Sequence, residues 1–164
     1  MRRFSVSLLT VLVLSLGTSL AQTIDAPPSP IPPGQYWGGL SVGGGGASGL
    51  TFHFGLLNAL GQGISLRPHL QVGSLGTFGI GADAMFNLPV NVEGPLAVYA
   101  GGGPSVALGG VTALGINLFV GAEYRLVDLD FPAGGIFLEL GPNLNLTPIF
   151  TGGFYGRGGL NFHF

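Results

Sequence analysis

From residue 36 to residue 164, apolar and polar residues alternate with a period of two, and the phase is kept through the whole segment. Between Ile64 and Val72 the even positions are apolar and the odd positions are polar or charged, apart from the proline at position 68. The same division of even and odd positions recurs in 114–126, 136–146 and 154–164. Successive side chains of a β-strand point to opposite faces, so this pattern predicts strands that each have one apolar face.

Eight runs of this kind are separated by segments rich in Gly, Asn, Asp and Pro, which favour turns. Each run is close to the ~9–11 residues that a tilted strand needs to cross a bilayer. No helical period of 3.6 is found after residue 35. The sequence therefore predicts an all-β chain of eight antiparallel strands in up-and-down order. The expected strands are 35–45, 48–58, 63–74, 77–88, 95–107, 112–126, 134–146 and 153–164.

The charge content indicates which face is inside. Only 7% of the residues are Asp, Glu, Lys or Arg, against about 25% in soluble proteins. A secreted soluble barrel or sandwich, the alternative, needs a charged exterior. Lipid outside the apolar face instead requires every backbone group to be paired within a closed sheet. We therefore expect an eight-stranded transmembrane β-barrel over 35–164, with the odd positions facing its lumen. The charged strand residues all occupy odd positions: Arg67, Asp83, Glu123, Arg125, Glu139 and Arg157.

The first 34 residues differ from the rest. Arg2 and Arg3 precede an apolar stretch, and small residues at positions 19 and 21 form a cleavage site. This pattern predicts a signal peptide over 1–21 rather than a membrane anchor. Residues 22–34 contain five prolines, which favours an extended linker over a docking ligand. The absence of cysteine excludes disulfides, a thiol nucleophile and a cysteine-based metal site.

The segment 156–164, GRGGLNFHF, places a polar residue, a glycine and two aromatic residues at Arg157, Gly159, Phe162 and Phe164. This spacing resembles the C-terminal assembly signal of bacterial outer-membrane β-barrels. With the strand count, it makes the chain from residue 35 resemble the small eight-stranded barrels of the OmpA/OmpX type. The terminal aromatic residue, which is in phase with the alternation, also suggests that the last strand pairs with the first.

The resemblance implies export to the bacterial outer membrane, outer-membrane lipid as the solvent, and the barrel-assembly machinery as a transient partner. It also implies that both ends of the barrel domain face the periplasm. The longest connections, 90–95 and 127–135, would then be periplasmic. This departs from the long external loops of the family and argues against an adhesin.

Aromatic residues at the strand ends are expected to form an interfacial girdle near the periplasmic side, as is typical of membrane barrels. They are Tyr36, Trp37, Phe86, Tyr124, Phe162 and Phe164.

The lumen is expected to hold ion pairs, because an unpaired charge inside a protein is costly. A short turn after residue 74 places Arg67 opposite Asp83. A turn centred near residue 131 places Glu123 opposite Glu139, with Arg125 diagonal to Glu139. Arg157 supplies a further cation. These residues predict a polar plug in the periplasmic half, below a roomier half lined by Gly, Ser and Thr.

An eight-stranded barrel is just wide enough for side chains to fill, so the plug favours a structural role in anchoring the envelope, with envelope or surface-layer components as partners. The alternative is a narrow channel for water, ions or small solutes, which the inward-facing glycines favour. His53, His69 and His163 are interpreted as hydrogen-bonding residues of the lumen, not as catalytic groups or metal ligands. Asp128 and Asp130 are interpreted as a solvated turn rather than a calcium site. The sequence thus predicts no enzymatic activity and no cofactor, and the few basic residues argue against nucleic-acid binding.

Overall fold

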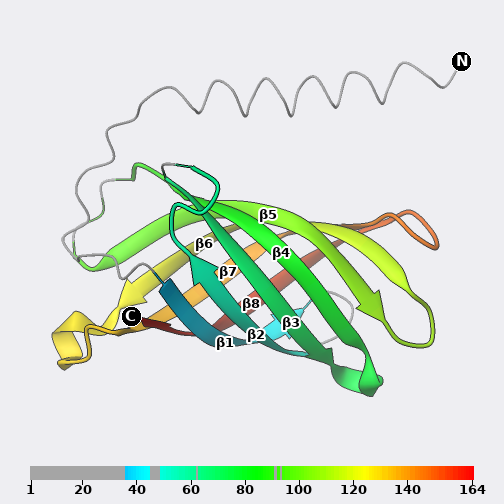
Figure 1. Cartoon of the computed structure of the whole chain (residues 1–164), viewed down its shortest axis with the longest axis horizontal. Coiled ribbons are helices and arrows are strands. Elements are labelled where there is room, and N and C mark those ends of the chain that lie inside the picture. Colours follow the sequence, from blue (N-terminus) through cyan, green and yellow to red (C-terminus); the bar gives the residue numbers. More distant parts are fainter. Residues whose placement is uncertain (1–35, 45–48, 62, 91, 93) are drawn as a thin grey trace, which may run out of the picture.

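The computed structural model describes residues 36–164 except 45–48, 62, 91 and 93 (Figure 1). The expected signal peptide, 1–21, and linker, 22–34, lie outside the described residues. Within the described part, no helix is long and apolar enough to cross a bilayer. The strands are β1 Tyr36–Gly44, β2 Gly49–Leu56, β3 Ile64–Gly73, β4 Phe78–Asn87, β5 Leu96–Leu108, β6 Ala113–Arg125, β7 Gly134–Asn145 and β8 Thr151–His163. Two short 3-10 turns, η1 Ser74–Gly76 and η2 Leu126–Leu129, lie between strands.

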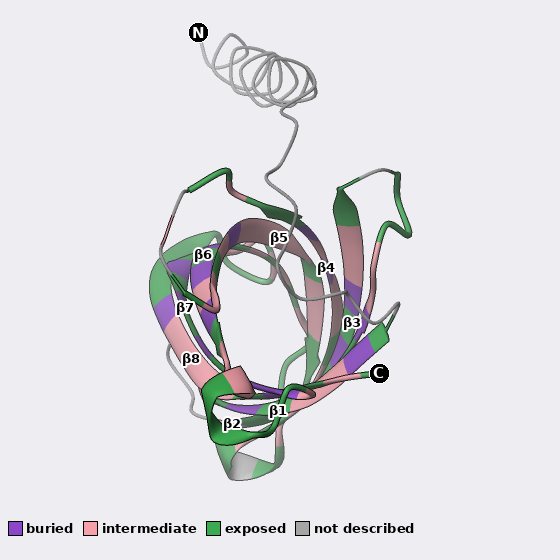
Figure 2. Cartoon of the chain, turned by 90° about the vertical axis from the view of Figure 1, so that its left-hand side faces the viewer, coloured by how far each residue is buried: buried purple, intermediate pink, exposed green. Residues whose placement is uncertain are grey.

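The eight strands form a closed antiparallel barrel in the order of the sequence, as Figure 2 shows. The ring is closed by β8 and β1, which pair from Trp37 opposite His163 to Gly44 opposite Gly156. The up-and-down barrel and its closure are therefore confirmed. Each strand begins and ends within two residues of the predicted boundary. We call the end where β1 begins and β8 ends the terminal rim, and the opposite end the far rim.

The burial pattern is the reverse of that in a water-soluble protein. In β7, Ile136, Leu138 and Leu140 are at least half exposed, whereas Phe137 and Glu139 between them are inaccessible. The same alternation places apolar side chains on the outside of the other strands. An apolar surface of this kind suits lipid, because the closed ladder pairs the backbone groups that lipid cannot pair.

The prediction that Trp37 lies in the outer aromatic girdle is wrong. Its side chain is only 5% exposed and points into the lumen, where its ring lies 5.3 Å from that of His53. Position 37 is odd, so the strand turns it inward whatever the chemistry of its side chain. Tyr36, Phe86 and Tyr124 are exposed at strand ends on the terminal rim, and the ring of Tyr36 stacks on Phe54.

The cross-strand register was predicted correctly for one hairpin and wrongly for another. Arg67 lies opposite Asp83, as the short turn between β3 and β4 requires. Glu123, however, lies opposite Phe137 and not opposite Glu139, a shift of two residues between β6 and β7. The connection is centred on residue 130 rather than 131, and Asp130, which follows η2, has a left-handed backbone conformation. A shift of two keeps every side chain on its face, so the alternation does not detect it.

The apolar exterior generates a first prediction. Leu138→Arg places a charge near the middle of the lipid-facing wall, and should lower the free energy of unfolding by about 2–4 kcal/mol. The measurement is equilibrium unfolding in urea of the barrel folded into lipid vesicles.

Leu129→Arg is the matched control, because Leu129 is exposed in η2, outside the strands. It should change the stability by less than about 1 kcal/mol. Equal losses for the two variants would contradict a lipid-facing wall.

Candidate functional site in the lumen

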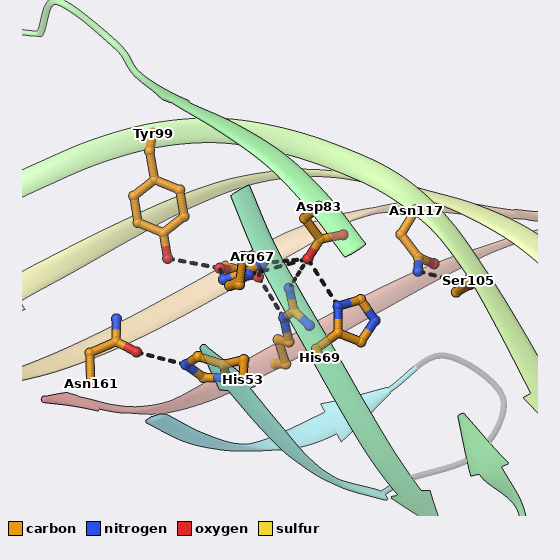
Figure 3. Close-up of polar contacts among 10 residues, drawn as sticks. His53, Arg67, His69, Asp83, Tyr99, Ser105, Asn117 and Asn161 are labelled. Carbon is orange, nitrogen blue, oxygen red and sulfur yellow. Dashed lines mark hydrogen bonds and ion pairs between the residues drawn. The ribbon is translucent and has the colours of Figure 1, made fainter. Parts of the chain in front are cut away.

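Four charged side chains from four strands meet inside the barrel. Arg67 comes from β3, Asp83 from β4, Glu139 from β7 and Arg157 from β8, and Figure 3 shows the contacts around Arg67. We call these four residues the ion cluster. Because β3 and β4 lie across the barrel from β7 and β8, the cluster spans the lumen.

Each arginine of the ion cluster contacts both carboxylates. Arg67 donates from Nη1 to Glu139 Oε1 at 2.5 Å and from Nη2 to Asp83 Oδ2 at 2.9 Å. Arg157 donates from Nε to Glu139 Oε2 at 2.5 Å and from Nη2 to Asp83 Oδ2 at 3.1 Å. Two cations therefore balance two anions. Charge-assisted bonds of this geometry are the strongest hydrogen bonds that proteins make.

Three of the four side chains of the ion cluster are inaccessible to water, whereas that of Arg157 is 10% exposed. Arg67 and Glu139 are 0% exposed and Asp83 is 1% exposed. Tyr99 donates its hydroxyl to Glu139 Oε1 at 2.8 Å. Both guanidinium groups lie against the ring of Phe119, at 4.8 Å for Arg67 and 5.5 Å for Arg157. The arginines are thus fixed by ionic and by cation–π contacts together.

A second polar group lies between the ion cluster and the terminal rim. Glu123 accepts a bond from Asn161 Nδ2 at 2.5 Å, and its other oxygen lies 2.6 Å from His163 Nε2. The oxygen of Asn161 is 2.8 Å from His53 Nε2. Arg125 is only 3.8 Å from Glu123 and donates to the carbonyl of Pro132 at 2.9 Å. We call Glu123, Asn161, His53 and His163 the terminal polar group.

Inward-facing glycines in this half of the barrel give space to large neighbours. Gly55 lies opposite Trp37, Gly101 opposite Phe119 and Gly121 opposite Tyr99. A Cβ atom added at Gly121 would lie 2.8 Å from the ring of Tyr99, and one at Gly101 would lie 2.7 Å from the ring of Phe119. These glycines are therefore part of a packed interior.

The far half of the lumen is emptier. A cavity of about 240 Å³ lies between the ion cluster and the far rim. Small and neutral residues line most of it, among them Thr51, Gln71, Ser105, Asn117 and Asn143. Figure 3 shows Asn117 and Ser105 on their strands, beyond His69 and Asp83. His69, Tyr155 and Arg157 also line the cavity.

Of the six charged residues proposed from the sequence, the structure brings four into one cluster. It separates Glu123, which belongs to the terminal polar group, and Arg125, which does not reach Glu139. The sequence reasoning missed Tyr99 and Phe119 as partners of the ion cluster, and Asn161 as a member of the terminal polar group. All three occupy odd positions, so the even–odd alternation predicts that they face the lumen. The alternation does not predict which inward-facing residues contact one another. Among the described residues, no set of three His, Asp or Glu side chains is arranged to hold a metal ion.

No protein-family model and no curated protein sequence matches the chain. Two solved structures are similar to it. The barrel superposes on Neisserial surface protein A (NspA) with a TM-score of 0.51 and 15% identity, over 79% of this chain and 96% of that one. It superposes on the N-terminal β-barrel domain of Pseudomonas aeruginosa OprF with a TM-score of 0.56 and 13% identity, over 81% of this chain and the whole of that one. The chain has the fold of the small outer-membrane β-barrels. At these identities the likeness concerns the fold and not the lumen residues.

The ion cluster generates a second prediction. Arg67→Met leaves Asp83 and Glu139 with a single guanidinium, and should lower the free energy of unfolding by about 3–5 kcal/mol. Trp37, the only tryptophan, lies beside Arg67 in the lumen. Its fluorescence during urea unfolding in lipid vesicles measures the change.

Arg125→Met removes the same charge outside the ion cluster. We expect the free energy of unfolding to fall by only about 1–2 kcal/mol, from one hydrogen bond and the 3.8 Å contact with Glu123. If Arg125→Met lowered the free energy of unfolding as much as Arg67→Met, the ion cluster would contribute no more to stability than a charge outside it.

Proposed function

We propose that this protein is an integral protein of the bacterial outer membrane with a structural role, in which it anchors or stabilises the envelope. Its lumen is closed by the ion cluster and the aromatic side chains packed beside it. It acts without catalysis, and its partners are outer-membrane lipid and components of the envelope or its surface layers. Export depends on a signal peptide over 1–21, followed by the linker over 22–34.

One observation supports the closed lumen above the others. The ion cluster joins strands on opposite sides of the barrel, and its two arginines pack against Phe119. Trp37 and Phe137 fill the lumen nearer the terminal rim, and both are buried. A solute that crosses the barrel must displace both layers. This arrangement favours a rigid set of contacts that joins opposite sides of the barrel over a conducting path.

The proposal also assigns an assembly role to the C-terminal strand. Phe162 and Phe164 are exposed on the outside, and Phe164 pairs with Tyr36 through two backbone hydrogen bonds. Gly159 and Arg157 lie opposite Ser41 and Gly43 of β1. The barrel-assembly machinery would therefore read residues on the strand that closes the ring.

The second candidate is a narrow channel for water, ions or small solutes. The cavity in the far half favours it, since it leaves that half of the lumen open as far as Arg157 of the ion cluster. Arg157 both lines this cavity and pairs with Glu139. A change in its pairing would be the opening step of such a channel.

The two candidates differ in a third prediction, the conductance of the refolded mature protein in a planar lipid bilayer. A structural barrel should give no discrete steps, and Arg157→Ala should stay silent because Trp37, Phe119 and Phe137 still fill the lumen. That variant should only lose stability, by about 3–5 kcal/mol.

Arg125→Ala is the control, since Arg125 is not part of the ion cluster. The barrel must first be shown to be folded by its altered gel mobility on heating. Discrete steps in the native protein that change in Arg157→Ala, but not in Arg125→Ala, would overturn the structural role in favour of the channel.

Localisation generates a fourth prediction. The protein expressed in its own cells should be recovered in the outer-membrane fraction, and its N-terminal residue should be Gln22, because cleavage after Ala21 removes the signal peptide. Mass spectrometry of the purified chain measures this. Recovery of a chain that retains Met1 in the inner membrane would contradict export.

A further inference from the structure

We propose that the cavity in the far half of the lumen is a binding site for a small neutral polyhydroxylated molecule, a sugar or polyol of up to one pyranose ring. This goes beyond the structural role, which makes no use of the cavity. We call this cavity the lumen cup; of the ion cluster, only Arg157 lines it.

The size of the lumen cup restricts its occupant. Its volume of about 240 Å³ equals roughly eight water molecules at ~30 Å³ each. It lies just below the ~300–1,000 Å³ of pockets that hold drug-sized ligands. A molecule with one ring fits this space, whereas an oligosaccharide or a folded peptide segment does not.

The charge of the lumen cup favours a neutral occupant. Arg157 is the one lining residue with a permanent charge, and both carboxylates of the ion cluster neutralise it at 2.5 and 3.1 Å. An anion would compete with Asp83 and Glu139 for the guanidinium group. A cation would find no lining carboxylate, because neither acidic side chain of the cluster lines the cup.

The polar groups of the lumen cup match hydroxyls. Asn117 and Asn143 come from β6 and β7, Gln71 comes from β3, and all three line the cup. A carboxamide presents a donor and an acceptor side by side, and so do neighbouring hydroxyls of a sugar. Asn117 uses one donor on Ser105 at 3.3 Å, which leaves its oxygen available. An acyl chain would desolvate these groups without replacing their hydrogen bonds, which is costly.

An unpaired hydroxyl marks the lumen cup as a site with unused hydrogen-bonding capacity. The hydroxyl of Tyr155 is buried and has no hydrogen-bond partner among the described residues, although Tyr155 lines the cup. Buried polar groups are nearly always paired in proteins. Gly43 and Gly79 also line the cup, from β1 and β4.

The test is a titration of the refolded mature protein in a detergent without a sugar headgroup, because glucoside or maltoside detergents would compete. The probes are D-glucose, glycerol and sodium sulfate, and the readout is the NMR signals of the side-chain amides of Gln71, Asn117 and Asn143. Glucose should shift these signals saturably, with a dissociation constant of about 1–50 mM. Glycerol should bind more weakly, and sulfate should give no saturable shift.

Two variants tie the binding to the lumen cup. Asn143→Leu should weaken glucose binding by about tenfold or more, because it removes the donor–acceptor pair. Tyr155→Phe, which removes a single oxygen and keeps the ring, should weaken it by about three- to tenfold. Asn87→Leu is the matched control, since Asn87 is exposed at the opposite end of β4 and should leave the affinity unchanged.

Three outcomes would overturn the inference. The first is the absence of a saturable shift with glucose, which leaves a cavity that holds only water. The second is a saturable shift with sulfate of equal or greater affinity, which indicates an anion site. The third is equal affinity in native protein, Asn143→Leu and Tyr155→Phe, which places glucose elsewhere. The titration requires only a folded barrel, so none of these outcomes decides between the structural and channel roles.

Discussion

The closed backbone ladder is the constraint on which the rest of the structure depends. An apolar exterior offers no partner to an N–H or C=O group, so pairing must be completed within the ring. Pairing of β8 with β1 removes the last edges. Three mid-strand prolines, which have no backbone N–H to donate, each interrupt this ladder. Pro68, Pro104 and Pro142 each keep the register with one neighbouring strand, and the ladder to the other neighbour is interrupted beside them. All three occupy outward positions on alternate strands, so no strand pair is interrupted twice.

Closure of the ring fixes the faces, and the faces fix the chemistry of the lumen. Every odd position points into a space of limited volume, so large inward side chains need small ones opposite. The pairs of Trp37 with Gly55 and Tyr99 with Gly121 follow from this limit. Charges placed in the same space must neutralise one another, because their water is removed. Two arginines and two carboxylates satisfy this requirement with direct contacts, and Tyr99 adds a donor to Glu139.

Much of this arrangement was predictable from the sequence, since alternation is a local property. The even–odd alternation predicts the strands and the face on which each side chain lies. The short turn between β3 and β4 then predicts the Arg67–Asp83 pair. Contacts across the lumen did not follow, because they depend on the shear of the whole ring. Arg67 meets Glu139, 72 residues away, through this long-range geometry. The position of Glu123 was predicted wrongly because η2 moves the centre of one connection by one residue. The prediction for Trp37 is wrong because an aromatic residue at a strand end suggests the outer girdle, whereas its odd position directs the side chain into the lumen.

The contrast between the two halves of the lumen also has a simple origin in side-chain volume. Toward the terminal rim, inward glycines at positions 55, 101 and 121 each lie opposite a large aromatic residue, whose ring fills the space beside them. Toward the far rim, glycines are joined by Ser, Thr, Asn and Gln, and the larger lining residues His69, Tyr155 and Arg157 leave a cavity of about 240 Å³ unfilled. Glycine therefore accompanies a filled lumen in one half of the barrel and an open cavity in the other. Because the short side chains at the far rim are also the neutral hydrogen-bonding ones, the half with space for a solute is the half whose groups suit a neutral polar solute.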